Sequence, residues 1–402
     1  MLGNRVSRRD FLRFGAGLAV MGLAACQEGG QQPAASPTPV VTGPPLKVGI
    51  IEPNSGVFAD LGRDQINGFN LYLEKVNFVA GGRRIQLVVE DETADPATAL
   101  TKARKLIEAD RVDMLAGVIS SASALAMRDL VHQSRVFTVI SNASANDITR
   151  ARKSPYIFRV SNTNYQMAFP LGKWLIDNGH NRIVLMFADY AAGREVADAL
   201  RQGFGSGEIV DTIPFPLGNT DFSSVIDRIR ASRVNMVAGF AAGTDAVIFL
   251  RQFAQAGLAG RIQLALHDSV DRAELAAVGR DALGVYTSDF WAPTLDNPAN
   301  RQFVDEYRRR YNEEPSRYAV AAYDAARLLV ETINAVNGDT SDPDRLVRAA
   351  ETIRFDSPRG LFEFDPTTHH VVQNIYLRQV REQGGRVTNV VVSDLGRIRD
   401  PG

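Results

Sequence analysis

The chain has 402 residues, of which 45% are hydrophobic and 23% charged, and its formal net charge is −1. A chain of this length is longer than one hydrophobic core usually serves, so two domains are the default expectation. The near-zero charge argues against a nucleic-acid-binding protein and an acidic tail, and the single cysteine excludes a disulfide framework.

The N-terminal segment has the pattern of an export signal. A basic region containing Arg8 and Arg9 precedes an apolar stretch over residues 14–25, which is too short to span a bilayer comfortably. Residues 7–13 match the twin-arginine export pattern, although a chance arginine pair in an ordinary Sec signal is the alternative. Residues 1–25 are therefore predicted to be a removable signal peptide.

A possible lipid anchor follows the apolar stretch. Leu23-Ala24-Ala25-Cys26 resembles the bacterial lipobox, in which the cysteine is acylated and becomes the first residue of the mature protein. An unmodified cysteine inside a cleaved signal is the alternative. Residues 26–45 are rich in Gly, Gln, Pro, Ser and Thr and are predicted to be a flexible tether. We expect an exported protein, in the periplasm or on the outer face of the cytoplasmic membrane, whose lipid anchor is its only membrane contact.

Strand and helix patterns alternate from Leu46 onward. The first series contains strands at 46–51, 85–91, 112–118 and 136–140, with helices at 62–77, from Asp95, and at 123–133. In the second of these helices, Asp95 is suited to the N-cap and Pro96 to the first helical position.

A second series of the same kind begins after residue 180. Its strands are predicted at 182–188, 209–215, 234–240 and 262–266, with helices that begin near Ala192, Phe222 and Asp245. Two strand–helix–strand series predict an α/β protein with two doubly wound parallel-sheet lobes. The remaining chain predicts helices at 300–311 and 316–337, then a polar break, and then hairpin-like strands at 360–364, 371–380 and 386–392.

Several short motifs occur in a characteristic order. They are Lys47-Val48-Gly49-Ile50, Glu90-Asp91-Glu92, Gly117-Val118-Ile119-Ser120-Ser121, Asp189-Tyr190-Ala191-Ala192-Gly193-Arg194 and Asp221-Phe222-Ser223. Over residues 46–392 the chain resembles the leucine/isoleucine/valine-binding type I periplasmic substrate-binding proteins of ABC transporters. The resemblance implies three crossings between the lobes, with lobe I formed by 46–162 plus 290–370 and lobe II by 163–289 plus 371–395.

Two loops of the first series are suited to a carboxylate ligand. In open α/β sheets, ligands bind beyond the carboxyl ends of strands, where helix N-termini offer unpaired N–H groups. The loops at 120–123 and 141–146 follow predicted strands and are rich in serine and small residues. Serines that only cap their helix are the alternative interpretation.

The resemblance assigns roles to four residues near these strand ends. It implies that Ser121 binds a ligand carboxylate, and that the Ala143 carbonyl and the Ser144 hydroxyl hold the ammonium and the carboxylate. Asp268 corresponds to the acidic residue that receives a ligand ammonium. An Asp that serves only as a turn residue or N-cap is the alternative at that position.

The walls of the cleft would be apolar. Candidates are Phe58, Leu61, Tyr190, Phe240, Phe290 and Trp291, for each of which ordinary packing is the alternative role. The family frequently has aromatic residues where this chain has Ala192 and Ala242, so the lobe II side of the cleft is expected to be roomier.

These features predict a substrate-binding lipoprotein of an ABC importer, with a branched-chain or other small amino acid as its ligand. The alternatives are an aromatic, benzoate-type carboxylate, and ligand sensing for a receptor. We expect a monomer whose partners are the importer's membrane subunits, with no nucleic acid, cofactor or metal. No enzyme is expected, since the five histidines lack metal-ligand spacing, His369 and His370 fall in a predicted turn, and no nucleophile elbow or Walker A loop occurs.

Overall fold

The computed structural model of the protein describes residues 41–402 except Ala94 and Ala242. The predicted signal peptide, Cys26 and most of the predicted tether lie outside the described residues. Within the described part of the chain, no helix is long and apolar enough to cross a membrane.

The first half of the fold, which we call lobe I, is built on a parallel sheet. Its strands lie in the order β3-β1-β4-β5-β6, with the short β2 paired antiparallel to β3 at the edge. In this order the chain adds strands first on one side of β1 and then on the other, as in a doubly wound fold. The strands are β1 (Leu46–Glu52), β2 (Val79–Ala80), β3 (Arg83–Asp91), β4 (Met114–Gly117), β5 (Thr138–Ile140) and β6 (Ile157–Arg159), and the helices between them are α1 (Ala59–Lys75), α2 (Pro96–Arg104) and α3 (Ser121–Ser134).

The second half, lobe II, repeats this plan. Its parallel strands lie in the order β8-β7-β9-β10-β11. They are β7 (Arg182–Ala188), β8 (Glu208–Phe215), β9 (Met236–Phe240), β10 (Gln263–His267) and β11 (Tyr286–Asp289), with the helices α4 (Asn164–Asp177), α5 (Ala191–Phe204), α6 (Ser223–Ser232), α7 (Thr244–Gln255) and α8 (Arg272–Val278). Hydrophobic cores cover both faces of this sheet, which explains why β7 and β9 are almost continuously apolar.

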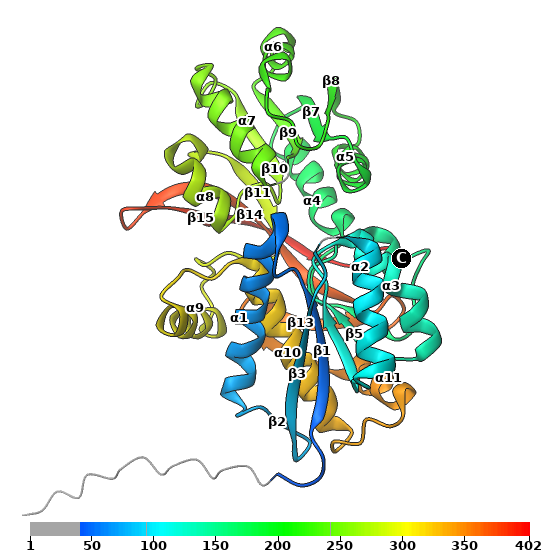
Figure 1. Ribbon diagram of the computed structural model, residues 1–402. Coiled ribbons are helices and arrows are strands. Elements are labelled where there is room, and N and C mark those ends of the chain that lie inside the picture. The colour runs from blue at the N-terminus through cyan, green and yellow to red at the C-terminus, as the bar shows by residue number, and fades with distance from the viewer. Residues whose placement is uncertain (1–40, 94, 242) are drawn as a thin grey trace, which may run out of the picture. The chain divides into compact units, whose positions relative to one another are not determined.

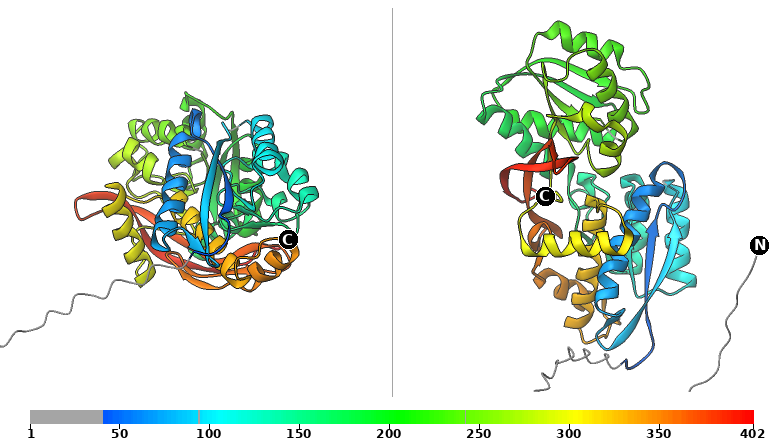
Figure 2. Two further views of the ribbon diagram at one scale, coloured as in Figure 1. Left: turned by 60° about the horizontal axis from the view of Figure 1, so that its bottom comes forward. Right: turned by 90° about the vertical axis from the view of Figure 1, so that its left-hand side faces the viewer.

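One long strand joins the two halves. The strand β14 (His370–Gln383) pairs with β6 of lobe I at its start and antiparallel with β11 of lobe II further along. The chain therefore passes between the lobes after β6, after β11 and within β14, as Figures 1 and 2 show. The predicted fold class, two doubly wound lobes with three crossings, is confirmed.

The elements after β11 complete lobe I and the connection. They are α9 (Pro298–Tyr311), α10 (Arg317–Ala335), α11 (Pro343–Thr352), β12 (Phe355–Ser357), β13 (Gly360–Asp365) and β15 (Arg386–Ile398). The helix α10 packs against α1 in the lobe I core. Short helical turns occur at Gly56–Phe58, Lys105–Ala109, Asn146–Ile148 and Gly279–Ala282.

Two local predictions are wrong. The segment after residue 337, predicted to be a polar break without structure, contains the helix α11. Asp342 caps this helix by accepting a hydrogen bond from the Asp344 N–H, and Leu346 and Ala350 are buried on its one apolar face. Of the two histidines predicted to lie in a turn, only His369 does so. His370 is the first residue of β14 and is 1% exposed.

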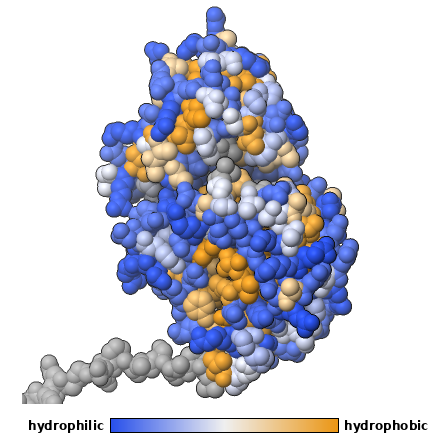
Figure 3. All heavy atoms as spheres, in the orientation of Figure 1, coloured by the Kyte–Doolittle hydropathy of each residue, from blue (hydrophilic) through white to orange (hydrophobic). Residues whose placement is uncertain are grey.

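The predicted N-terminus of the helix at Asp95 matches the structure. Asp95 is the N-cap of α2, with Pro96 as the first helical residue, and its carboxylate accepts a hydrogen bond from the Thr98 N–H at 2.8 Å. The face of the molecule in Figure 3 is mainly hydrophilic, but apolar side chains gather on lobe I, where Val89 of β3 is 42% exposed.

Candidate ligand-binding site

The backbone has positive φ angles at two successive residues where β4 ends. Gly117 has φ 110°, and a Cβ atom there would lie 2.4 Å from the Ile51 carbonyl oxygen. Val118 has φ 75°, a left-handed conformation that strains a β-branched residue. The chain then enters α3, where the Ser120 hydroxyl caps the helix by accepting a hydrogen bond from the Ser123 N–H.

Two buried carboxyl groups, those of Glu52 and Glu92, lie near the loop after β4, and Glu92 is hydrogen-bonded to its backbone. Glu92 accepts hydrogen bonds from the Ile119 N–H at 3.2 Å and the Ser120 N–H at 3.0 Å. Burial raises the pKa of Glu92 to about 7, against these two hydrogen bonds. Burial also raises the pKa of Glu52, at the end of β1, and the nearby charge of Glu92 adds to this effect.

The two serine loops are joined to each other through Ser121. Its hydroxyl oxygen accepts from the Ser144 N–H at 3.1 Å and the Ala145 N–H at 3.0 Å, so its own hydrogen remains able to donate. Ser121 and Ser144 are half-buried neighbours, whereas Ala143 is fully buried and its carbonyl accepts from Arg159 at 3.3 Å. The capping role belongs to Ser120, so Ser121 is not a simple cap.

The acidic residue of lobe II does not stand alone. Asp268 follows β10 with φ 46°, and its Oδ2 lies 2.5 Å from the Nη2 of Arg317. Arg317 is the first residue of α10 in lobe I, so this ion pair joins the lobes. Burial raises the pKa of Asp268 well above its usual value, and the Arg317 charge opposes that rise.

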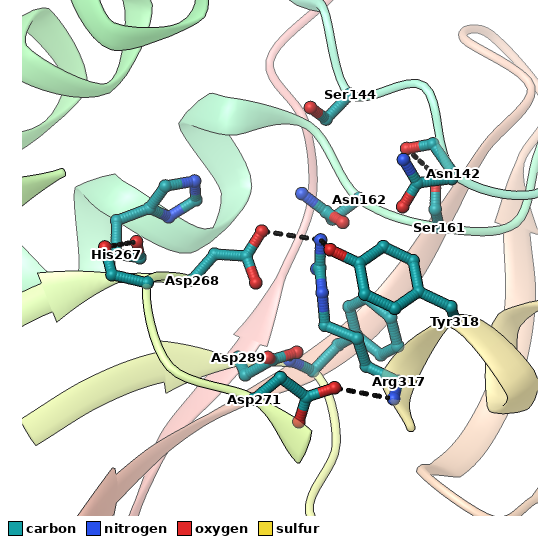
Figure 4. A network of polar contacts seen from close by, with 12 residues as sticks. Asn142, Ser144, Ser161, Asn162, His267, Asp268, Asp271, Asp289, Arg317 and Tyr318 are labelled. Carbon is teal, nitrogen blue, oxygen red and sulfur yellow. Dashed lines mark hydrogen bonds and ion pairs between the residues drawn. The ribbon is translucent and has the colours of Figure 1, made fainter. Parts of the chain in front are cut away.

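Further charges surround this pair. Arg378, from β14, lies 2.9 Å from Asp289 and 3.7 Å from Asp271, and the backbone N–H of Arg317 donates to Asp271 at 3.1 Å. Figure 4 shows these carboxylates around Arg317. We call the five residues Asp268, Asp271, Asp289, Arg317 and Arg378 the charged centre. It draws on both lobes and on two of the crossing segments.

Several polar atoms near the charged centre have no hydrogen-bond partner among the described residues. They include Asn162 Oδ1, His267 Nδ1, Asp268 Oδ1 and the Nε and Nη1 of Arg317. Figure 4 shows Asn162 and His267 beside Asp268 and Arg317. Burial lowers the pKa of His267 to about 3, and the Arg317 charge adds to the effect, so its imidazole is neutral. Buried polar groups are normally satisfied, so this cluster is suited to contacts with a bound molecule.

The apolar candidates have different surroundings. Tyr190 is the half-buried N-cap residue of α5, and its ring centre lies 6.3 Å from that of Phe240. Phe290 is buried, and its ring centre lies 5.7 Å from the Cζ of Arg317. Trp291 lies in the lobe I core and donates from Nε1 to Asn300 at 2.7 Å. Phe58 and Leu61 are half-buried near the start of α1, Ala192 is half-buried in α5, and Ala242 lies outside the described residues.

A second ion pair joins the lobes at the side of the site. Arg272, the first residue of α8, donates from Nη2 to both carboxylate oxygens of Asp64 in α1, at 2.7 and 2.8 Å. Asp64 is 2% exposed, and burial raises its pKa against the opposing charge of Arg272. On the other side of the boundary, Glu195 of α5 accepts from the Asn146 N–H of lobe I at 3.2 Å.

Sequence reasoning missed Arg317, Asn162 and Arg378. One signal for Arg317 was available, since a basic residue in the first turn of a helix opposes the helix dipole and calls for a compensating anion. Asn162 and Arg378 carry no such local signal, because their neighbours come from distant parts of the chain.

The two-lobed fold with polar groups meeting at the boundary is that of a type I binding protein. Residues 45–386 match the periplasmic binding protein family, and the chain belongs to that family. Its fold and family are those of substrate-binding proteins of ABC transporters, which bind small molecules and interact with the transporter's membrane subunits, and are not those of enzymes.

Three similar proteins illustrate this. The Leu/Ile/Val-binding protein homolog 6 of Brucella melitensis is 33% identical, over 89% of this chain and 93% of its own length. An ABC transporter substrate-binding protein from Sphaerobacter thermophilus is 33% identical, with a TM-score of 0.85 over 89% of this chain and 99% of that one. A solute-binding protein from Rhodopseudomonas palustris, solved in complex with 3,4-dihydroxybenzoic acid, is 32% identical, with a TM-score of 0.83 over 89% and 98% of the two chains.

Proposed function

We propose that the protein captures a small aromatic carboxylate between its lobes and delivers it to the membrane subunits of an ABC importer. The observation that carries the choice of ligand is the state of Asp268. This residue was expected to receive a ligand ammonium, but it is already paired with Arg317 at 2.5 Å. A ligand with an acid group and no amine needs no carboxylate from the protein, so its binding does not depend on Asp268 being free to receive an ammonium.

The similar proteins support the same choice. The Rhodopseudomonas palustris protein named above was solved with a dihydroxybenzoic acid and shares about a third of its residues with this chain. Tyr190 is half-buried in lobe II, and its ring centre lies 6.3 Å from that of Phe240. Aromatic rings favour offset or edge-on contacts with one another, which suits a benzoate ring.

An amino acid is the second candidate, and one observation favours it. Arg317 and Asp268 have opposite charges and unpartnered atoms among the described residues, so a zwitterion could bind with its carboxylate on one and its ammonium on the other. The Brucella relative is also named as a Leu/Ile/Val-binding homolog. Asp268→Asn separates the two, because it should abolish tight binding of a zwitterion and leave a benzoate bound at least as well.

The residues predicted to carry export and anchoring complete the proposal. A twin-arginine signal over residues 1–25 would export the folded protein, and acylated Cys26 would hold it at the membrane, with residues 26–45 as the tether. The protein would work as a monomer. Delivery to an importer is preferred over sensing for a receptor because the family's named relatives belong to transporters.

A ligand screen tests the proposal directly. The soluble body, residues 41–402, would be tested by thermal shift against benzoate, 4-hydroxybenzoate, 3,4-dihydroxybenzoate, leucine, isoleucine and valine. A ligand at 1,000 times its Kd stabilises the folded state by about 4 kcal/mol, which is readily measured. A matched pair of variants then locates the site. Ser144→Ala removes a hydroxyl near the expected ligand, whereas Ser223→Ala changes a hydroxyl at the start of α6, away from it. Stabilisation by none of the three benzoates would refute the proposed ligand class, and stabilisation by leucine, isoleucine or valine alone would favour the second candidate.

A further inference from the structure

Arg317 occupies a position that helix stability does not explain. It is the first residue of α10, whose N-terminus is capped by the Ser316 hydroxyl accepting from the Ala319 N–H. The N-terminus of a helix carries partial positive charge, so a guanidinium there is disfavoured. Arg317 is also only 4% exposed, which adds a desolvation cost. Arg317 therefore needs an anion to offset both costs.

The anion it meets in this structure uses only part of its capacity. Asp268 engages Nη2 at 2.5 Å, and Nη2 also lies 3.5 Å from the Tyr318 hydroxyl. Nε and Nη1 have no hydrogen-bond partner among the described residues. A guanidinium has five N–H donors in a rigid fork that matches a carboxylate with two parallel hydrogen bonds. Each face of a guanidinium that can form two parallel hydrogen bonds includes Nη2, paired either with Nε or with Nη1. A carboxylate that replaces Asp268 at Nη2 therefore finds its second donor in Nε or Nη1, both unpartnered among the described residues.

The surroundings of the guanidinium suit an aromatic acid. Its Cζ lies 5.7 Å from the ring centre of Phe290 and 4.6 Å from that of Tyr318. Figure 4 shows Asn162 and Asp268 on the same side of the guanidinium, and both have an unpartnered oxygen. Ligand hydroxyl groups could donate to such oxygens. The arrangement combines a cation, aromatic faces and free acceptors within one small region.

The ion pair also joins the lobes, which makes it replaceable. Arg317 belongs to α10 of lobe I, and Asp268 follows β10 of lobe II, so separation of the lobes breaks their contact. A ligand that enters the open form meets a guanidinium without its partner. Burial raises the pKa of Asp268 and the Arg317 charge opposes that rise, so displacement of Asp268 from Arg317 favours the protonated, neutral form of Asp268.

We propose that Arg317 is the specificity-determining residue that binds the ligand's carboxylate, in place of Asp268, and so selects acids over their neutral analogues. This inference rests on the proposed function, since it concerns the ligand of the same site. It adds to the role that the family resemblance implies for Ser121, whose hydroxyl oxygen accepts from the Ser144 and Ala145 N–H groups while its own hydrogen remains able to donate to a carboxylate. Ser121 then holds the two loops together, and Arg317 recognises the charge.

The test compares each acid with its amide. Titration calorimetry would measure Kd for benzoate and benzamide, and for leucine and leucinamide, on the parent protein and on Arg317→Met. Loss of a charge-assisted hydrogen bond corresponds to about a 10- to 100-fold weaker Kd for the acid. The amide should bind with little change, because it never used the positive charge. The acid-to-amide ratio is the readout that a purely structural role of Arg317 would not alter.

Two further variants keep the test interpretable. Arg317→Met leaves Asp268 buried without its partner and could prevent folding, so the double variant with Asp268→Asn removes both charges together. It should show the same loss of preference for the acid. Arg327→Met is the matched control, because Arg327 lies on the same helix, donates to Glu331 at 2.8 Å and stacks on Phe355 away from the charged centre. It should leave the acid-to-amide ratio unchanged.

The outcomes separate the two proposals. If the parent binds benzoate and both Arg317 variants keep its preference for benzoate over benzamide, the assignment of Arg317 is wrong and the proposed function stands. If the parent binds leucine alone, the aromatic ligand is wrong, and the ratio of leucine to leucinamide still tests Arg317. If the parent binds neither benzoate nor leucine, the proposed ligand class is wrong and the inference about Arg317 is refuted with it. A preference lost in both variants and kept in Arg327→Met supports the assignment.

Discussion

Replacing Asp64 by Asn should weaken ligand binding although Asp64 lies outside the charged centre. The substitution keeps the volume of the side chain and one acceptor oxygen, but removes the negative charge that faces Arg272 across the lobe boundary. In the structure Arg272 Nη2 is 2.7 and 2.8 Å from the two carboxylate oxygens, and Nη1 is 2.9 Å from Glu313. Because the pair joins lobes I and II, it contributes only when the lobes are together.

The magnitude follows from the burial of the pair. A hydrogen bond between charged groups contributes about 1.5–3 kcal/mol. Desolvation offsets much of this gain, because burial is the largest influence on the pKa of Asp64 and raises it, and 24% of the Arg272 side chain is exposed. We therefore expect the lower part of this range, about 1.5–2 kcal/mol, taken from the closed state alone. At 1.4 kcal/mol per tenfold change, Kd should rise roughly 10- to 30-fold.

Titration calorimetry with the best ligand of the screen would measure this change. Asp60→Asn is the matched control, because Asp60 lies on the same helix and pairs with Arg63 within that helix, with both side chains more than half exposed. It should leave Kd within twofold of the parent. Should Asp64→Asn also bind within twofold of the parent, the pair does not favour closure and the reasoning fails.

Three more predictions concern export, closure of the lobes and the pH dependence of stability. Replacing Arg8 and Arg9 by Lys should block export, and Cys26→Ser should release the protein from membranes. Cell fractionation that finds the Cys26→Ser protein still bound to membranes would disprove the lipid anchor. Small-angle scattering should give a smaller radius of gyration with saturating ligand, since ligand contacts to both lobes exist only when they close, and an unchanged radius with bound ligand would argue against closure. Glu92 has a folded-state pKa of about 7, above its ordinary value of 4.5, so the folded state binds more protons and loses stability as pH rises between these values. Glu92→Gln should therefore flatten the dependence of the unfolding free energy on pH in that window, by at most about 3 kcal/mol, and denaturant titrations at pH 4.5, 6 and 7.5 that parallel the parent would refute this.

Local features of the chain predicted most of the elements correctly. The strand at 182–188 coincides with β7, and the helix after Asp95 begins where its cap and proline place it. The error at α11 has the opposite cause. Only a narrow apolar face of that helix is buried, so its mostly polar composition resembles a loop.

The candidate site was predicted in part. Ser121 and Ser144 are neighbours, and Asp268 lies at the lobe boundary, because all three follow strands of parallel sheets and such strand ends gather at one edge. What the sequence could not reveal is that each has a partner already. Ser121 is bonded to the next loop and Asp268 to an arginine from the other lobe.

The sequence by itself determined the two-lobed architecture and the family, since alternating apolar periods and short motifs in order depend on residues near one another in the chain. Only the tertiary structure decided the chemistry of the site. Asp268 follows β10, whereas Arg317 and Arg378 lie in α10 and β14, and their contacts exist because the chain crosses between the lobes three times. The charge that a ligand meets depends on which buried groups pair with each other, and that pairing is set by distance in space and by loss of water, neither of which is written in the local sequence.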